Sequence, residues 1–283
     1  MLFRKSKRKE SKKALSNKNL QQALRKASLS HFEKYDKTRG EISWDAIKEK
    51  ARAIRKECVS RLSELIEKFS EEAANAGAHV YKTSAPEEAL AVIEKILKER
   101  HARLVVKSKS MVSEEIGLNA YLEKRGYKVV ETDLGEWIVQ LAKDRPSHIT
   151  APALHKTKEE VAEIFSKHLG RRVPPEIPEL VRIARQEMRK IFVEADAGIS
   201  GANLAVAESG TLVIISNEGN ARLVTSLPPV HIALVTSEKF VETLEQATTL
   251  IKALITGSSG LMMTSYVSFS ISVFLLGPVM KET

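Results

Sequence analysis

The fold is decided by residues 104–132, which read LVVKSKSMVSEEIGLNAYLEKRGYKVVET. Two short apolar runs, Leu104–Val106 and Val129–Thr132, enclose the amphipathic segment Ser113–Arg125. Short apolar runs of this length are typical of buried strands, whereas apolar residues at three- and four-residue steps are typical of a helix. A strand, a helix and a second strand in this order predict two parallel strands joined by a crossover helix.

The same alternation continues on both sides of this stretch. Strands are predicted at 79–82, 149–153, 203–207, 211–216 and 231–235, and helices at 86–100, 134–143, 158–169, 179–195 and 238–255. Glu208-Ser-Gly210 is a short turn between two strand-like runs and predicts a hairpin. The sequence therefore predicts an α/β protein with a mainly parallel sheet wrapped by helices.

The part of the chain before this pattern has a different character. Residues 17–76 show only helical periodicity and predict an α-helical extension. Residues 1–16 form a basic flexible tail, because Met1–Lys13 carries seven Lys or Arg residues and a single acid. Such a tail could contact nucleic acid or an acidic partner, but no interleaved aromatic residues accompany it, so a solvated arm is favoured over nucleic-acid binding. Residues 77–283 form the predicted α/β domain.

Composition restricts the possible functions of the chain. Nowhere do about 18 apolar residues follow one another, so no membrane span is expected. The amino terminus does not have the pattern of a secretory signal, which favours the cytoplasm. The chain has one cysteine, which can neither form an internal disulfide nor supply the four thiolates of an iron–sulfur cluster. We therefore expect no cofactor within this chain.

The first candidate site is the polar run Lys107, Ser108, Lys109 and Ser110, where a predicted strand passes into a helix. In an open parallel sheet this is the carboxyl edge, where ligands usually bind, and the free N–H groups of the following helix favour an anion. The four residues could hold a carboxylate or phosphate. The alternative is that the serines cap the helix and the lysines are solvated.

A second group of candidates follows the helix at 179–195. Gly198 and Gly201 lie three residues apart before Asn203 and would allow close approach of a ligand, or simply form a helix cap and turn. Asn217, Glu218, Gly219 and Arg222 form another polar turn, in which the arginine could clamp a carboxylate bidentately. An ordinary turn explains the asparagine and glycine residues equally well.

Glu208 is the candidate catalytic residue, with Gly210 and Thr211 beside it. The Glu-Ser-Gly turn resembles the element that supplies the nucleophilic glutamate of coenzyme A transferases, where a carboxylate forms an acyl anhydride and then a thioester. The alternatives are a hairpin glutamate or an acceptor of a ligand hydrogen bond. We expect Lys107, Ser110, Asn203, Glu208 and Arg222 to share one polar cleft.

Other polar residues favour structural roles. Asp133 is expected to cap a helix whose first turn contains Glu136. His148, His155 and His231 have the spacing of no metal motif, so they are expected to be core or supporting residues rather than ligands.

Several segments in order resemble the lactate-utilization family over roughly residues 50–270. They are VVKSKSMVSEE (105–115), VETDLGE (130–136), PSHI (146–149), PALHK (152–156), EADAGISGAN (194–203), AESGT (207–211), NEGN (217–220), RLVT (222–225) and 228–232. The resemblance implies a fold like that of the sugar-phosphate isomerase and coenzyme A transferase group. It also implies participation in a multisubunit system that oxidises L-lactate to pyruvate. The iron–sulfur subunit of that system continues into a segment with ferredoxin-type cysteines, and this chain departs from the family pattern near Phe269.

Three hypotheses follow from the resemblance. The first is a subunit or accessory of L-lactate oxidation that binds a small anion and has the other lactate-utilization subunits, including a ferredoxin-like iron–sulfur protein, as partners. The second is a coenzyme A transferase-like enzyme that uses Glu208. The third is a non-catalytic ligand-binding or scaffold remnant, because we expect a truncated, frameshifted or split family member.

Overall fold

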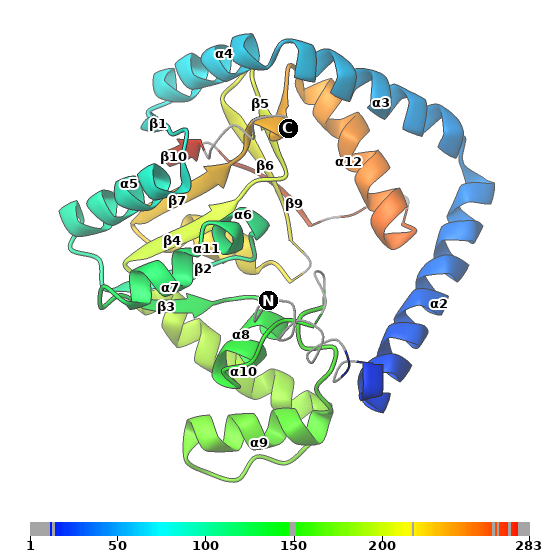
Figure 1. Cartoon of the computed structure of the whole chain (residues 1–283), viewed down its shortest axis with the longest axis vertical. Coiled ribbons are helices and arrows are strands. Elements are labelled where there is room, and N and C mark those ends of the chain that lie inside the picture. The colour runs from blue at the N-terminus through cyan, green and yellow to red at the C-terminus, as the bar shows by residue number, and fades with distance from the viewer. Residues whose placement is uncertain are drawn as a thin grey trace.

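The computed structural model describes residues 12, 15–147, 151–216, 218–261, 264, 266–270 and 273–276. A six-stranded sheet, with every strand pair parallel, forms its centre in the order β1-β10-β7-β4-β2-β3 (Figure 1). Its strands are β1 (Val80–Lys82), β2 (Leu104–Lys107), β3 (Lys128–Glu131), β4 (Ala197–Gly201), β7 (Val230–Val235) and β10 (Val273–Leu276). The predicted α/β class with a mainly parallel sheet is confirmed.

Helices cover both faces of this sheet, which explains why its strands are apolar on both sides. The helices beside the sheet are α5 (Pro86–Glu99), α6 (Met111–Glu115), α7 (Leu118–Glu123), α8 (Leu134–Leu141), α9 (Lys158–Leu169), α10 (Ile177–Glu194) and α11 (Asn220–Ser226). Alternate residues of β2 point to opposite faces: Val105 packs with α5 and α7, whereas Val106 packs with α8, α9 and α10. The quoted segment 104–132 thus forms the predicted parallel pair.

A second, four-stranded sheet was not foreseen as a separate unit. Its order is β8-β5-β6-β9, with β5 (Leu204–Val206), β6 (Thr211–Ile215), β8 (Phe240–Val241) and β9 (Val267–Ser270). The pair of β5 and β6 is antiparallel, as the predicted hairpin requires. This sheet shares a core with Ala233 and Val235 of β7 and with α3, α4 and α12.

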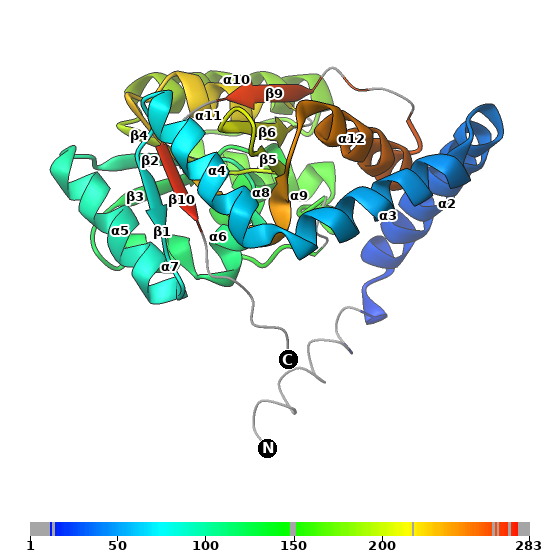
Figure 2. The same ribbon diagram turned by 90° about the horizontal axis from the view of Figure 1, so that it is seen from above.

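Three helices lie within the predicted extension: α2 (Lys18–Glu41), α3 (Trp44–Ser60) and α4 (Leu62–Asn75). α3 and α4 pack on the second sheet together with α12 (Leu244–Ser259). α2 lies at the outer edge of the molecule in both views (Figure 1, Figure 2). Its carboxyl-terminal half contacts α12, where the Thr38 hydroxyl donates to the carbonyl of Gly260 at 2.6 Å. Within the described part of the chain, no helix is long and apolar enough to cross a membrane.

Two predicted elements are corrected. Residues 148–150 lie outside the described residues, and the rest of the strand predicted at 149–153 is a turn in which Ser147 N donates to the Pro152 carbonyl. The helix predicted from residue 238 begins only at Leu244, because Thr243 caps it by accepting a bond from Gln246 N. The residues before it form the 3-10 helix η1 (Ser237–Lys239) and β8.

Candidate functional site

The carboxyl edge of the six-stranded sheet holds a buried ion pair between neighbouring strands. Lys107 is the last residue of β2, and its side chain is 1% exposed. Its Nζ lies 2.9 Å from Glu131 Oε1 at the end of β3 and donates to Ser113 Oγ at 2.9 Å. Asn119 Nδ2 also donates to Glu131 Oε1, at 2.6 Å. Lys107 therefore joins two strand ends and a helix rather than facing an open site.

Lys109 is the second cation at this edge of the sheet. Its Nζ is buried, has no hydrogen-bond partner among the described residues, and lies 3.4 Å from Glu136 Oε1. Glu136 is in the first turn of α8, after β3. Burial raises the pKa of the Glu136 carboxyl, an effect that the Lys109 ammonium partly offsets. An ammonium and a carboxyl group of raised pKa therefore share the space between the β2–α6 and β3–α8 connections.

A third carboxyl group reaches this region from the loop before α11. Glu218 Oε2 accepts a bond from Leu134 N at 3.0 Å, at the start of α8. Burial raises the pKa of Glu218, and the charge of Asp133 adds to that increase. Asp133 caps α8 as predicted, because its Oδ1 accepts from Glu136 N. Two carboxyl groups of raised pKa thus lie near Lys109, whose charge acts on the pKa of both.

The serines of the polar run have structural partners. Ser108 is buried, and its N–H donates to the Ile199 carbonyl of β4. Ser110 caps α6, as the alternative interpretation proposed, because its Oγ accepts from Ser113 N at 3.4 Å. α6 has only five residues, so this cap serves mainly to turn the chain. Neither serine role depends on a ligand.

Gly198 and Gly201 are not in a turn, and this expectation is corrected. Both lie in strand β4, where Gly198 pairs with His231 and Gly201 with Leu234 of β7. A Cβ on Gly198 would lie 2.0 Å from the Val224 carbonyl oxygen of α11, and one on Gly201 would lie 2.7 Å from Ser110 Oγ. The glycines are required for close packing of α11 and of the β2–α6 connection.

The other described candidate residues have structural partners of their own. Asn203 Oδ1 accepts from Ile215 N and so holds the open end of the β5–β6 hairpin. Arg222 Nε donates to Ser268 Oγ of β9 at 3.0 Å, which directs the guanidinium to the second sheet. Gly219 has a positive φ of 76° and precedes α11. Asn217 lies outside the described residues.

Glu208 is at the closed end of the same hairpin, beside α4 and α12. Its Oε1 accepts from Leu244 N at 2.7 Å, and Gly210 lies against the backbone of Ala73. Asn203 and Glu208 flank β5, whose three residues span about 10 Å at about 3.3 Å per residue. The two side chains bond to different elements at opposite ends of β5, and the expectation of one shared cleft stays a prediction. Thr211 accepts a bond from Ser209 at this turn. The catalytic role of Glu208 stays a prediction.

A Glu208→Gln variant should lose the negative charge at the amino terminus of α12. We expect the free energy of unfolding to fall by about 0.5 kcal/mol, because a carboxylate at a helix amino terminus interacts favourably with the helix dipole. Urea denaturation of the variant and of Glu245→Gln, each also in a Lys50→Gln background that removes the exposed ion pair of Glu245, would separate the Leu244 contact from a general charge effect. Equal losses in the two variants would contradict the assigned role.

Sequence reasoning did not identify Glu131 as a member of the edge site. The feature that could have identified Glu131 is its position at the end of a predicted strand. In the structure it lies opposite Lys107 in the register of β2 and β3. The histidines have supporting contacts: His231 Nε2 lies 2.7 Å from Ser200 Oγ in the core, and His155 Nε2 lies 3.1 Å from Asp144 Oδ2. His148 lies outside the described residues. In the part of the chain that is described, no three His, Cys, Asp or Glu residues gather as metal ligands.

Comparison with known proteins shows the family to which this α/β protein belongs. Residues 66–278 match the LUD domain, which covers most of the chain. The chain belongs to the LUD domain family. The match begins inside α4, so α2 and α3 lie before the family domain.

Two curated relatives are both named lactate utilization protein B. The protein of Exiguobacterium sp. is 44% identical over 230 residues, which cover 81% of this chain and 49% of the relative. The protein of Oceanobacillus iheyensis is 39% identical over 263 residues, which cover 90% of this chain and 54% of the relative. The chain thus spans about half the length of these relatives. A crystal structure of a DUF162 family protein from Deinococcus radiodurans aligns with a TM-score of 0.42 and 15% identity, covering 76% of this chain and 97% of that one.

Proposed function

We propose that this chain is a subunit or accessory of a system that oxidises L-lactate to pyruvate, and that it binds a small carboxylate at the edge of the six-stranded sheet. The name of the relatives, lactate utilization protein B, supports the process. The observation that carries the site is the buried Lys109 ammonium without a hydrogen-bond partner among the described residues. A buried cation without such a partner is costly, and a ligand carboxylate would supply one.

The charge state of the acids near Lys109 determines whether this site would accept an anion. Four ionised acids (Glu131, Asp133, Glu136 and Glu218) would repel a carboxylate, but Lys107 neutralises Glu131 through the buried pair. Burial raises the pKa of Glu136 and of Glu218, so both groups are more readily protonated than an exposed glutamate. A neutral carboxyl group can donate a hydrogen bond to a ligand oxygen, and once ionised it can accept the hydroxyl proton of a hydroxy acid. This chemistry suits lactate and pyruvate.

Oxidation of lactate also requires an electron acceptor. Iron–sulfur clusters would supply it in a partner or in a further segment of the protein, since relatives are about twice as long as this chain. Cys58, the single cysteine, is buried and hydrogen-bonded to Gln246, so the residues of this chain do not fit a four-thiolate cluster. The role of the chain would be to hold the carboxylate of lactate and to accept the proton of its hydroxyl group.

The test is calorimetric titration of the full chain with L-lactate and with pyruvate at neutral pH. The variant Lys109→Gln should bind either ligand at least tenfold more weakly, because a charge-assisted hydrogen bond contributes about 1.5–3 kcal/mol. The matched control is Lys158→Gln. The Lys158 side chain is exposed on α9 and contacts none of the acids near Lys109 named above. This control should bind like the unaltered chain.

The outcomes separate the hypotheses. Absence of lactate and pyruvate binding, or equal binding by Lys109→Gln and the control, would refute the proposed site. Binding that depends on Lys109, without lactate oxidation when partner subunits are added, would favour the scaffold hypothesis. A coenzyme A thioester of the Glu208 side chain, formed with release of the free carboxylate and detected by intact mass after incubation with an acyl-coenzyme A, would instead favour the transferase hypothesis.

A further inference from the structure

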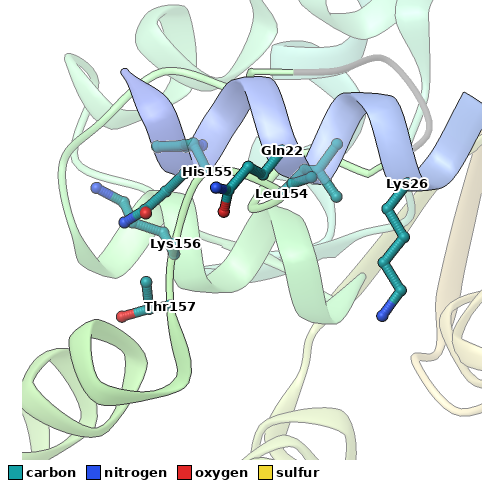
Figure 3. Close-up of a pocket in the computed structure, with 8 residues that line it drawn as sticks. Gln22, Lys26, Leu154, His155, Lys156 and Thr157 are labelled. Carbon is teal, nitrogen blue, oxygen red and sulfur yellow. The ribbon is translucent and has the colours of Figure 1, made fainter. Parts of the chain in front are cut away.

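A cavity lies between the helical extension and the α/β domain. It has a volume of about 290 Å³ and is lined by Asn19, Gln22, Ala23 and Lys26 of α2 and by Leu154, His155, Lys156 and Thr157 before α9. Figure 3 shows α2 lying across the 154–157 segment, with Gln22 beside His155 and Lys26 extending from the same helix. The volume is at the lower end of the range typical of small-molecule sites, which begins near 300 Å³.

The four α2 residues in the lining belong to a single face of that helix. Positions 19, 22, 23 and 26 recur at three- and four-residue steps, so they share one face. That face carries two side-chain amides and an ammonium, each able to donate a hydrogen bond. Thr157 and Lys156 add a hydroxyl and a second ammonium from the domain. The lining contains no acidic residue.

The acids near the cavity are already engaged. Asp144 Oδ2 lies 2.6 Å from Lys156 Nζ and 3.1 Å from His155 Nε2, and these contacts hold the pKa of Asp144 well below its usual range. Glu160 accepts a bond from Thr157 N in the capping box of α9. Glu159 lies 3.8 Å from Lys158 Nζ. Lys26 is exposed and makes no ion pair with the other described residues, so its ammonium is available to a ligand in the cavity.

Two further observations favour an anion in this cavity. His155 Nδ1 is buried and lacks a hydrogen-bond partner in the described part of the chain, while Asp144 lies against the other ring nitrogen. Nδ1 could donate to a bound oxyanion if the imidazole carries a proton on both nitrogens. The first turns of α2, which has 24 residues, and the N-cap of α9, which has 12, both border the cavity. Both helices therefore contribute residues from their amino-terminal part to the lining.

We propose that this cavity binds a small oxyanion, a polycarboxylate or a phosphate, which bridges α2 and the 154–157 segment. Lys26, Gln22 and Asn19 would hold it from the helix, and Lys156 and Thr157 from the domain. The site is separate from the sheet edge, and α2 lies before the residues that match the LUD domain. Occupancy would fix the amino-terminal end of α2 on the domain, so the anion would control the position of the extension.

Calorimetric titration of the full chain with citrate and with inorganic phosphate tests this proposal. At least one of the two should bind in a one-to-one ratio, and Lys26→Gln should bind it at least tenfold more weakly, as expected for loss of a charge-assisted bond of about 1.5–3 kcal/mol. The matched control is Lys37→Gln, which removes an exposed lysine from the same helix but outside the lining. This control should retain binding.

Hydrogen exchange supplies a second measurement. The bound anion should slow amide exchange in residues 18–26 of the unaltered chain and leave it unchanged in Lys26→Gln. The Lys109→Gln variant should keep citrate or phosphate binding, so failure of the sheet-edge site and failure of this site would be distinguished. No binding of either probe, equal affinity in Lys26→Gln and Lys37→Gln, or binding without slower exchange in α2 would overturn the proposal.

Discussion

Replacing Lys107 by methionine is expected to lower the free energy of unfolding by about 3–5 kcal/mol, because it leaves one buried charge without its partner. The Glu131 side chain is 7% exposed, and its Oε1 is 2.9 Å from Lys107 Nζ. Its second oxygen has no hydrogen-bond partner among the described residues. After the substitution only Asn119 would donate to this carboxylate. Urea denaturation at neutral pH, followed by circular dichroism, measures the loss.

The double variant Lys107→Met with Glu131→Leu removes both charges and is the control. It should recover much of the lost stability, since replacing a buried ion pair by apolar residues is often close to neutral. A loss below about 1 kcal/mol for Lys107→Met alone would contradict the structural role of the pair. It would leave Lys107 available to bind the ligand, as the sequence first suggested.

The same pair shows how far sequence reasoning reached at the candidate site. The run of lysines and serines after a buried strand predicted correctly that Lys107 and Lys109 lie at the carboxyl edge of a parallel sheet. Which lysine remains available was not predictable, because Glu131 meets Lys107 only through the pairing of β2 with β3. Lys109 meets Glu136 in the next connection. Such contacts depend on strand order, which local periodicity does not specify.

The sequence pattern failed to predict β4 and β8 for a common reason. β4 reads Ala-Gly-Ile-Ser-Gly, a composition that disfavours strands, and it is held in the sheet by tight packing that only glycine permits at Gly198. β8 has only two residues, too few to give a strand pattern in the sequence, so the late start of α12 was not predicted. In both places tertiary packing overrides local preference. The contact of Glu208 with Leu244 likewise follows from the hairpin, which a list of motifs does not place in space.

Acidification from pH 6.5 to pH 4 is expected to destabilise the protein by about 3 kcal/mol through His231 alone. Burial lowers the pKa of this imidazole to about 4, against about 6.5 in the unfolded chain. Between these values the unfolded state binds a proton that the folded state does not. Stability therefore falls as the pH falls through this window and is unaffected by His231 above pH 6.5. Urea denaturation at half-unit pH steps measures the effect.

The variant His231→Gln isolates this contribution from that of other titrating groups. Glutamine can still share a hydrogen bond with Ser200, whose Oγ lies 2.7 Å from His231 Nε2, but it does not titrate in this range. The difference in stability between the two proteins should change by about 3 kcal/mol across the window. Histidine chemical shifts of the unaltered protein give an independent reading, in which the His231 ring should remain neutral at pH 5. A His231 ring that is protonated at pH 5 would contradict this prediction, as would stability curves of the two proteins that run parallel across the window. Either result would show that the buried position between β4 and β7 tolerates a charged imidazole.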